Sequence, residues 1–443
     1  MKKAIYEFNF FYSTLLLAVN YGTRCHYRHL VIRGKERIPT DGPVILAPCH
    51  QNALMDPLIL LLKLGGPIVF LARADIFKKP AIRAILTFLR IMPAYRIRDG
   101  RDQLGRNAET FEKSIEVLQH GVPLCLMAEG THNDKHQLRP LVKGMFRIAG
   151  ESWKRLNGIE TSENCLSTAF DYSNSKPLYI VPVGMDYDEY ESPYSSVAIE
   201  IGKPIDVRPF MREFVENEPV ALNQMREALT VGLKAVMHHV ESTDGYESEY
   251  AYCHLATPDY LKEHKLRNTV WNRFQARKNL SLQLAAMPEE ERVTCLAKGQ
   301  AFADRCSRQG VPLWFASKGW KWWQTVLTLA SILGLLVLAI FNFQLSTLNF
   351  LLANPIVYLP THLITHRIIK DPQFRSSINY GIRLGLHMVY FLGMLIIGSL
   401  VVNFLWALMM VALGLVSAWL MPHLFALLRD VWYSFRWHPA GKE

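Results

Sequence analysis

The chain has 443 residues, half of them hydrophobic and a fifth charged, and its formal net charge is +10. This length suffices for about two or three domains. No zinc-finger, helix-turn-helix or stacking-aromatic signature accompanies the positive charge, so we expect attraction to anionic membrane lipids and no nucleic-acid partner. Neither a disulfide framework nor a metal site is indicated, because the cysteines lie far apart and form no C-x-x-C pair. They are Cys25, Cys49, Cys125, Cys165, Cys253, Cys295 and Cys306.

The first 24 residues combine Lys2 and Lys3 with an apolar, aromatic-rich run from Phe8 to Val19. This pattern resembles a signal peptide, but no convincing small-x-small cleavage site follows it. We therefore expect residues 1–24 to form an amphipathic anchor in the membrane interface.

Residues 25–240 alternate short apolar runs with stretches of helical spacing, which predicts an α/β domain. We expect a mostly parallel sheet flanked by helices, with ligands bound beyond the strand ends. The predicted strands are 44–48, 68–72, 122–128, 178–183 and 197–201, and the predicted helices are 57–64, 104–119, 141–156 and 218–239.

The first of these strands leads to His50 and Asp56. A histidine oriented by a carboxylate keeps one tautomer and stays basic near neutral pH, so this pair can take a proton from a hydroxyl. In the alternative reading Asp56 is a helix N-cap followed by Pro57 at the first helical position. A thiol nucleophile at Cys49 is a further alternative, although adjacent residues of an extended chain point to opposite faces.

Two further segments carry polar chemistry. Arg96, Arg98 and Arg101 suit an anionic ligand, because guanidinium groups bind phosphate in bidentate fashion. A solvated or membrane-facing basic loop is the alternative for Arg98 and Arg101. The third predicted strand leads into Glu129-Gly130-Thr131, where the carboxylate is expected either to hold hydroxyls, to pair with an arginine or to cap a turn.

The rest of the chain divides into a helical linker, 241–315, and a membrane domain, 316–443. The linker includes a helical stretch from Leu280 to Leu296 and offers no chemistry of its own. In the membrane domain, Lys318, Trp320 and Lys321 resemble the basic and aromatic belt at a membrane surface. We expect about four transmembrane helices, one over 325–341, one over 348–365 and two between 384 and 421 that turn near Asn403.

The basic residues of this domain fall on one side of the four expected spans, and the loops near Gln344 and Asn403 are neutral. By the positive-inside rule that side is cytoplasmic. We therefore expect an integral membrane protein, most simply of a bacterial inner membrane, with its active site at the cytoplasmic face. The residues are Lys318, Lys321, Arg367, Lys370, Arg375, Arg383, Arg429 and Arg436.

The ordered motifs resemble the acylglycerol-phosphate (PlsC-like) family of glycerolipid acyltransferases. Block one of that family matches His50 and Asp56, block two Pro93 and Arg96, block three 128–132, and block four Val181-Pro182-Val183. The resemblance implies a membrane-bound enzyme that transfers a fatty acyl group from acyl-CoA or acyl-carrier protein to glycerol-3-phosphate or its 1-acyl derivative. It implies no cofactor. His50 is then the general base, Asp56 orients it, and the remaining blocks bind substrate.

The chain departs from the family pattern at two places. Five residues separate His50 from Asp56 where the family has four, a spacing similar to that of a yeast-type glycerol-3-phosphate acyltransferase subgroup. His132 replaces the arginine of block three, so Lys143, Arg139 or Arg101 is expected to supply that phosphate contact. Acylation of another lyso-lipid acceptor, or a non-catalytic lipid-binding membrane scaffold, are the alternative functions.

Overall fold

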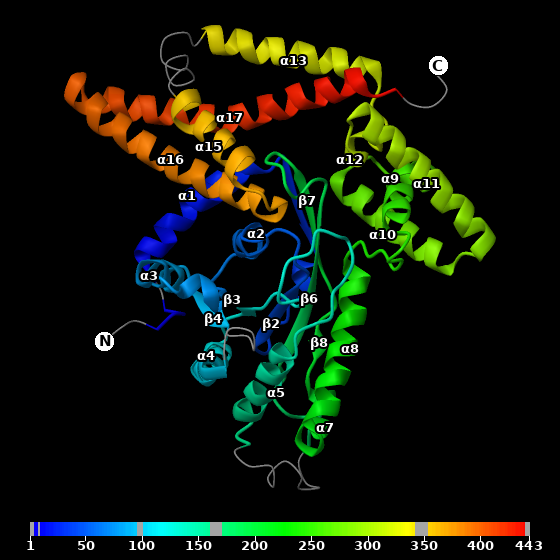
Figure 1. Ribbon diagram of the computed structural model, residues 1–443. Coiled ribbons are helices and arrows are strands. Elements are labelled where there is room, and N and C mark those ends of the chain that lie inside the picture. Colours follow the sequence, from blue (N-terminus) through cyan, green and yellow to red (C-terminus); the bar gives the residue numbers. More distant parts are fainter. Residues whose placement is uncertain (1–3, 8, 95–100, 160–170, 342–352, 439–443) are drawn as a thin grey trace. The chain divides into compact units, whose positions relative to one another are not determined.

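The computed structural model describes residues 4–7, 9–94, 101–159, 171–341 and 353–438, and they form two compact units (Figure 1). Unit 1 comprises Met1–Leu17, Ile32–Asp186 and Ile199–Met237. Unit 2 comprises Ala18–Val31, Tyr187–Ala198 and His238–Glu443. The division into four segments that we infer from the sequence stays a prediction.

One eight-stranded sheet has the order β1-β7-β6-β2-β5-β3-β4, with β8 paired to β6. The pairs of β2 with β5 and β6, and of β3 with β4 and β5, are parallel, whereas β8 runs antiparallel to β6. The predicted α/β class with a mostly parallel sheet is therefore confirmed. The strands are β1 (His29–Arg33), β2 (Val44–Pro48), β3 (Val69–Arg73), β4 (Ile91–Ala94), β5 (Leu124–Cys125), β6 (Tyr179–Tyr187), β7 (Ser196–Ile201) and β8 (Ile205–Asp206).

Strand β2 lies in the middle of the sheet, and every one of its residues is buried. Ile45 pairs with Leu124 of β5 on one side and with Ile180 of β6 on the other. A strand buried on both faces needs a continuous apolar sequence, which 44–48 supplies. The carboxyl end of β2 therefore holds the loop after Pro48 at a fixed place between two neighbouring strands.

Helices cover both faces of the unit 1 part of this sheet. Figure 1 shows α8 on one side of the strands and α2, α3 and α4 on the other. The four helices predicted from the sequence correspond to α2, α4, α5 and α8, each to within a few residues at both ends. The helices of unit 1 are α2 (Met55–Leu64), α3 (Pro80–Phe88), α4 (Arg101–Gln119), α5 (Gly144–Leu156), α7 (Met211–Glu216) and α8 (Glu218–Val236), and α1 (Phe10–His26) runs from unit 1 into unit 2.

Two of the predicted elements are shortened or interrupted in the structure. The strand expected over 122–128 is only Leu124–Cys125, although Leu126 and Ala128 still donate backbone hydrogen bonds to the carbonyls of Leu46 and Pro48. The helical stretch expected from Leu280 to Leu296 is interrupted at 287–288. Pro288 has an extended backbone with ψ 144°, which ends one helix and precedes the next.

The first part of unit 2 after residue 238 is helical. Helices α9 and α11 approach closely at Gly299, where an added Cβ would lie 2.1 Å from the carbonyl oxygen of Ser248. Only glycine permits this contact between the two backbones. The helices are α9 (Tyr246–Glu263), α10 (Val270–Ala286), α11 (Glu289–Gln309) and α12 (Leu313–Ala316).

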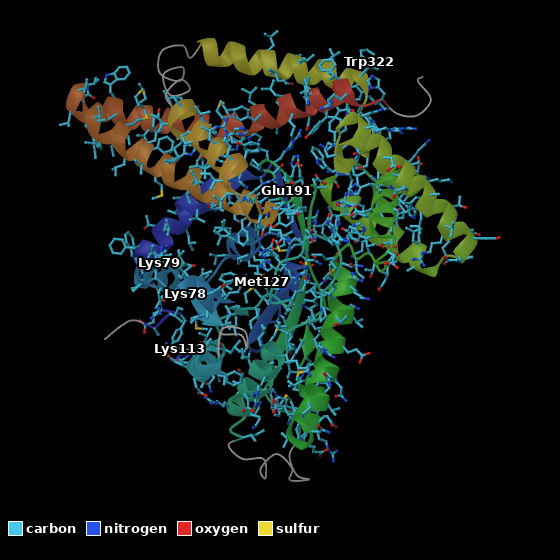
Figure 2. The ribbon with its side chains drawn as sticks, in the orientation of Figure 1. Lys78, Lys79, Lys113, Met127, Glu191 and Trp322 are labelled. Carbon is cyan, nitrogen blue, oxygen red and sulfur yellow. The ribbon has the colours of Figure 1, made fainter. Side chains whose placement is uncertain are left out.

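Two helices near the carboxyl end, α16 (Pro372–Val401) and α17 (Phe404–Arg436), are long and apolar enough to cross a membrane. They turn at 402–403, where the Asn403 side chain accepts a hydrogen bond from Trp406 N. Before them lie α13 (Trp322–Phe341), a π-helical segment (Asn354–Tyr358), α15 (Leu359–Leu363) and a second π-helical segment (Ile364–Ile368). Trp322, labelled in Figure 2, is 77% exposed at the start of α13.

The structure corrects the placement of several basic residues. Arg375 and Arg383, expected in a loop between spans, lie inside α16, because this helix already begins at Pro372. Arg429 and Arg436, expected beyond the last span, lie inside α17. The long helices therefore carry their positive charges on their own polar ends.

Lys318 lies between α12 and α13 in a mostly buried cluster of charges within unit 2. Its Nζ is 3.7 Å from Asp430 Oδ2, and Arg28 also binds that carboxylate. Burial lowers the pKa of Lys318 to about 8; Asp430 and Asp188 partly oppose this effect, while Arg28 and Arg273 reinforce it. A lysine of the unfolded chain keeps a pKa near 10.5.

We expect Lys318 to make stability rise with pH between about 8 and 10.5. In this range the unfolded chain binds more protons at this position than the folded chain, so the free energy of unfolding increases as pH rises. Thermal unfolding of wild type and Lys318→Met across this range measures the effect. As pH rises, the stability of the wild type should increase relative to that of Lys318→Met. The exposed Lys262→Met variant is the control. A constant difference between wild type and Lys318→Met would contradict the expectation.

Candidate active site

His50 and Asp56 lie in the loop that connects β2 to α2. Nδ1 of His50 is 2.8 Å from Oδ2 of Asp56, and the imidazole is 12% exposed whereas the carboxylate is fully buried. An ionised carboxylate accepts the Nδ1 proton, so the ring carries its hydrogen there. Nε2, on the opposite side of the ring, is then the nitrogen that can take up a proton.

The same carboxylate oxygen also organises the loop around it. Oδ2 of Asp56 accepts backbone hydrogen bonds from Gln51 N and Asn52 N, each at 2.8 Å. Asp56 N in turn donates to the carbonyl of Asn52 at 3.0 Å. The fifth intervening residue is therefore accommodated in a turn folded onto the carboxylate, and the contact between His50 and Asp56 is preserved.

Asp56 is not the helix N-cap. Helix α2 begins at Met55, the N-cap position belongs to Leu54, and no side chain caps the helix there. Asp56 thus lies in the first helical turn, and its carboxylate reaches back to the loop. The N-cap reading of the sequence is wrong because the helix starts two residues earlier than Pro57 suggests.

Cys49 points away from this loop into the sheet. It is 1% exposed, and its Sγ lies 3.2 Å from Met185 N and 3.7 Å from the Met185 carbonyl oxygen. Burial raises the pKa of this thiol far above its usual value, and Glu129 adds to the effect. A buried neutral thiol is a poor nucleophile, so the geometry does not support a covalent role for Cys49.

Glu129 connects the loop of block three to His50. Its Oε1 accepts a hydrogen bond from His50 N at 3.1 Å and its Oε2 accepts one from Arg139 N at 3.0 Å. Burial raises the pKa of Glu129, and these two backbone hydrogen bonds partly oppose the rise. Since both oxygens bind backbone amides, the described contacts of Glu129 hold two loops together.

The residues after Glu129 make further contacts in the junction, by which we mean the contact between the His50 loop and the loop that contains Glu129. Gly130 has φ +66°, and a Cβ there would lie 2.7 Å from Cγ1 of Val142, so the turn requires glycine. The His132 ring stands edge-on to that of His50, with centroids 5.6 Å apart. Asn133 N donates to the His50 carbonyl at 2.8 Å. Thr131, between these residues, is half-buried.

The predicted anion-binding residues have different positions. Arg96 and Arg98 lie outside the described residues, and Arg101 opens α4 without a described side chain. Lys143 is exposed and occupies the N-cap position of α5. It follows Val142, whose backbone N donates to the carbonyl of Ala128, directly before Glu129. Arg139 is exposed as well, so two cations border the loop that contacts His50.

Three other residues that follow or belong to predicted strands have no described contact with the His50 loop. Pro182 is in the middle of β6, opposite Ala47, and its ring packs beside Gly202 and Gly232. This position is in the core of the sheet, and a contact of Pro182 with substrate stays a prediction. Lys78 and Lys79, labelled in Figure 2, are exposed after β3.

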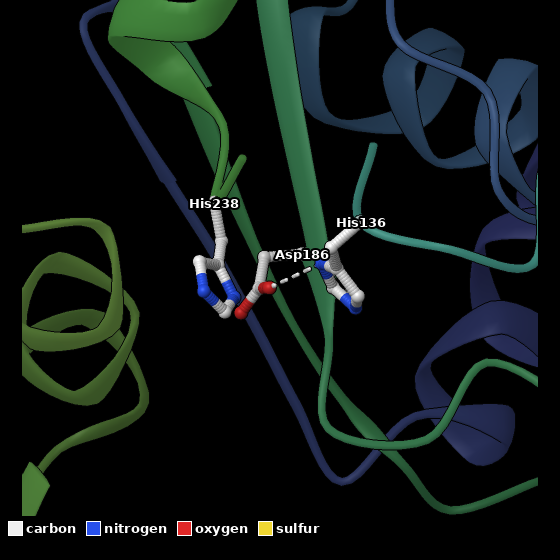
Figure 3. A group of neighbouring side chains, drawn as sticks. All are labelled: His136, Asp186 and His238. Carbon is white, nitrogen blue, oxygen red and sulfur yellow. Dashed lines mark ion pairs between the residues drawn. The ribbon is translucent and has the colours of Figure 1, made fainter. Parts of the chain in front are cut away.

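A chain of buried polar side chains beside the His50 loop is not evident from the sequence. Nε2 of Gln51 lies 3.2 Å from Nδ1 of His136, which lies 3.4 Å from Oδ1 of Asp186 (Figure 3). His136 is 6% and Asp186 2% exposed. These residues are far apart in the chain and belong to no common motif. The only indication in the sequence is that each is a polar residue.

The pair of His136 and Asp186 has the donor types of a metal site. Catalytic zinc sites use three protein ligands, and this pair supplies two from the described part of unit 1. His238, the third residue drawn in Figure 3, belongs to unit 2. The pair therefore gives no support for a metal within unit 1.

Comparisons with known proteins identify the domain that contains this loop. A family model described as Acyltransferase matches residues 29–186. A chloroplastic 1-acyl-sn-glycerol-3-phosphate acyltransferase of Brassica napus is 29% identical over 122 residues, which are 27% of this chain and 33% of that protein. A 1-acyl-sn-glycerol-3-phosphate acyltransferase of Borreliella burgdorferi is 28% identical over 120 residues, 27% of this chain and 46% of that protein.

A solved structure was also matched. The crystal structure of the 1-acyl-sn-glycerophosphate acyltransferase PlsC from Thermotoga maritima is 21% identical, with a TM-score of 0.31, and the match covers 49% of this chain and 81% of that one. The chain spans one third to just under half of the length of the two curated relatives above.

The predicted resemblance to the glycerolipid acyltransferases is confirmed by the family model and these relatives, whereas the subgroup suggested by the longer spacing stays a prediction. Residues 29–186 of this chain therefore match the Acyltransferase family model, and the relatives that align with the chain are 1-acyl-sn-glycerol-3-phosphate acyltransferases.

Proposed function

We propose that the protein is a membrane-bound O-acyltransferase that acylates 1-acyl-glycerol-3-phosphate or glycerol-3-phosphate, with acyl-CoA or acyl-carrier protein as donor. The observation that carries this proposal is the contact of His50 Nδ1 with the buried carboxylate of Asp56. The relatives that align with this chain are named 1-acyl-sn-glycerol-3-phosphate acyltransferases, which supports the same acceptor class.

The proposed reaction needs one base and no covalent intermediate. Nε2 of His50 takes the proton of the acceptor hydroxyl as its oxygen attacks the thioester carbonyl. Backbone amides near the site are expected to stabilise the oxyanion that develops. When the intermediate collapses, the thiolate leaves and takes the proton from the imidazolium. The products are an ester and a free thiol, and His50 returns to its neutral form.

Asp56 has two roles in this scheme. It keeps the Nδ1 proton in place, so that Nε2 faces the substrate unprotonated, and it stabilises the imidazolium that forms during the reaction. Because two backbone amides also bind its oxygen, it cannot rotate without breaking the loop. A non-catalytic scaffold would not need this orientation, so the geometry favours the enzyme.

We propose that the active site lies at the cytoplasmic surface of a membrane. Helices α16 and α17 have the length and apolar composition of spans. Phe10, Phe11 and Leu17 of α1 are more than two-thirds exposed, which supports an interfacial role for this helix. The basic residues at the polar ends of α16 and α17 support a cytoplasmic side by the positive-inside rule.

The proposed base is tested by His50→Ala and Asp56→Asn. We expect His50→Ala to lower kcat by about 10²–10⁴-fold, as is typical of general-base loss, and Asp56→Asn to lower it too, because the wrong tautomer becomes stable. Release of free CoA in the presence of both substrates measures the rate. His264→Ala, at an exposed histidine, is the matched control and should keep the wild-type rate. An unchanged rate in His50→Ala would show that another group is the base.

The role of Glu129 is tested by Glu129→Ala. The variant leaves the backbone amides of His50 and Arg139 without their carboxylate acceptor, at a cost of about 1–3 kcal/mol for each amide that stays buried. We expect a lower free energy of unfolding together with a lower kcat, measured by denaturant titration and CoA release. Glu263→Ala, at an exposed glutamate, should change neither. Full activity with normal stability would contradict the proposed junction.

Phosphate recognition is tested by Arg96→Ala, a residue proposed for this role from its sequence position. Removing one guanidinium should raise the KM for a phosphate-bearing acceptor and leave the KM for the acyl donor unchanged. Arg267→Ala, at an exposed arginine, is the control. A panel of acceptors with and without phosphate separates the two acceptor classes. Equal turnover of both, unaffected by Arg96→Ala, would favour a different lyso-lipid as acceptor.

A further inference from the structure

An apolar cavity of about 370 Å³ lies within unit 2, between the second half of α1, the middle of α16 and α17. This volume is in the range of small-molecule sites in proteins, about 300–1,000 Å³. Its walls include Ala18 and Gly22 of α1, Leu384 and Phe391 of α16, and Leu415 of α17. These side chains offer an apolar ligand contact along most of the cavity.

The place of the cavity along α16 matches the edge of a bilayer. The apolar run of this helix extends from Leu384 to Val401, which is about 27 Å at 1.5 Å per residue and close to the thickness of a hydrocarbon core. Arg383 directly precedes the run and also lines the cavity. One end of the cavity is therefore at the level of lipid headgroups, whereas Phe391 lies about two turns deeper.

Arg383 is a buried cation at that end. It is 6% exposed, and its Nε and Nη1 have no hydrogen-bond acceptor in the described part of the chain. The rings of Tyr194 and Tyr358 lie 5.2 and 5.3 Å from its guanidinium carbon. Within the described residues no carboxylate forms an ion pair with it.

Two histidines near Arg383 add further polar atoms that have no partner among the described residues. Nδ1 of His26 and Nε2 of His387 are both buried without a hydrogen bond. Both residues line the cavity. A buried charge is costly unless an opposite charge and hydrogen bonds compensate it. An anion with several acceptor oxygens at this end would supply both.

We propose that this cavity binds one acyl chain of an anionic glycerophospholipid from the membrane, with the lipid phosphate at Arg383. The guanidinium matches phosphate oxygens in bidentate fashion, and the apolar walls take the chain. A zwitterionic lipid brings its own cation to the phosphate and so gains less from Arg383. None of the described residues that line the cavity belongs to the His50 loop, and the proposal depends on membrane insertion of α16 and α17 but not on acyl transfer.

The test uses the full-length protein in phosphatidylcholine nanodiscs that contain a minor fraction of dioleoyl-phosphatidate. Native mass spectrometry after release from the nanodiscs measures which lipids stay bound. We expect the wild type to retain phosphatidate in preference to phosphatidylcholine. Arg383→Gln should weaken phosphatidate retention about tenfold, the usual effect of losing a charge-assisted hydrogen bond, and should leave phosphatidylcholine unchanged.

Matched variants make the outcome decisive. Arg375→Gln removes the same charge from the same helix, but Arg375 binds Glu191 and does not line the cavity, so it should retain phosphatidate. Arg383→Lys should retain it as well, whereas Ala18→Leu, which fills the cavity, should lose it. If Arg383→Gln does not fold, these two variants decide. Phosphatidate retention that is the same in Arg383→Gln or in Ala18→Leu as in the wild type would overturn the proposal.

Discussion

The candidate site depends on one buried carboxylate with several donors. Asp56 is fully buried and receives the imidazole of His50 and two backbone amides on a single oxygen. A buried charge of this kind persists only where hydrogen bonds replace its lost hydration. The tight loop after β2 supplies them, and it can do so because β2 is held on both sides by parallel strands. The position of His50 thus follows from the sheet.

A second buried carboxylate, that of Glu129, connects the His50 loop to the next loop. Glu129 binds the amides of His50 and Arg139, and the carbonyl of His50 accepts a hydrogen bond from Asn133. The Glu129 side chain and one backbone hydrogen bond in this way fix loops that follow different strands to each other. A preorganised loop of this kind has little to reorganise when the substrate arrives.

The sequence predicts the fold class, the central strand and most helices of unit 1, because apolar runs and helical periodicity mark buried elements directly. It predicts β4 poorly. Ile91–Ala94 contains Pro93 and reads as part of the arginine-rich segment, yet at the end of the sheet order a proline breaks no ladder on its outer side. The sequence does not predict the polar contact of Gln51 with His136, because this contact arises only from tertiary packing and follows no periodic pattern of residues. The sequence also fails to place Arg375 and Arg383 inside α16, because the helix extends beyond its apolar run.

The turn folded onto Asp56 also changes how relatives of this chain should be sought. The distance in sequence between the histidine and the aspartate is free to vary by a residue, because the loop takes up the difference while the carboxylate keeps its three donors. A search pattern that fixes the interval at four residues passes over chains of this kind. A pattern that instead demands a histidine after a buried strand and an aspartate in the first turn of the following helix would find them, whatever the count between the two.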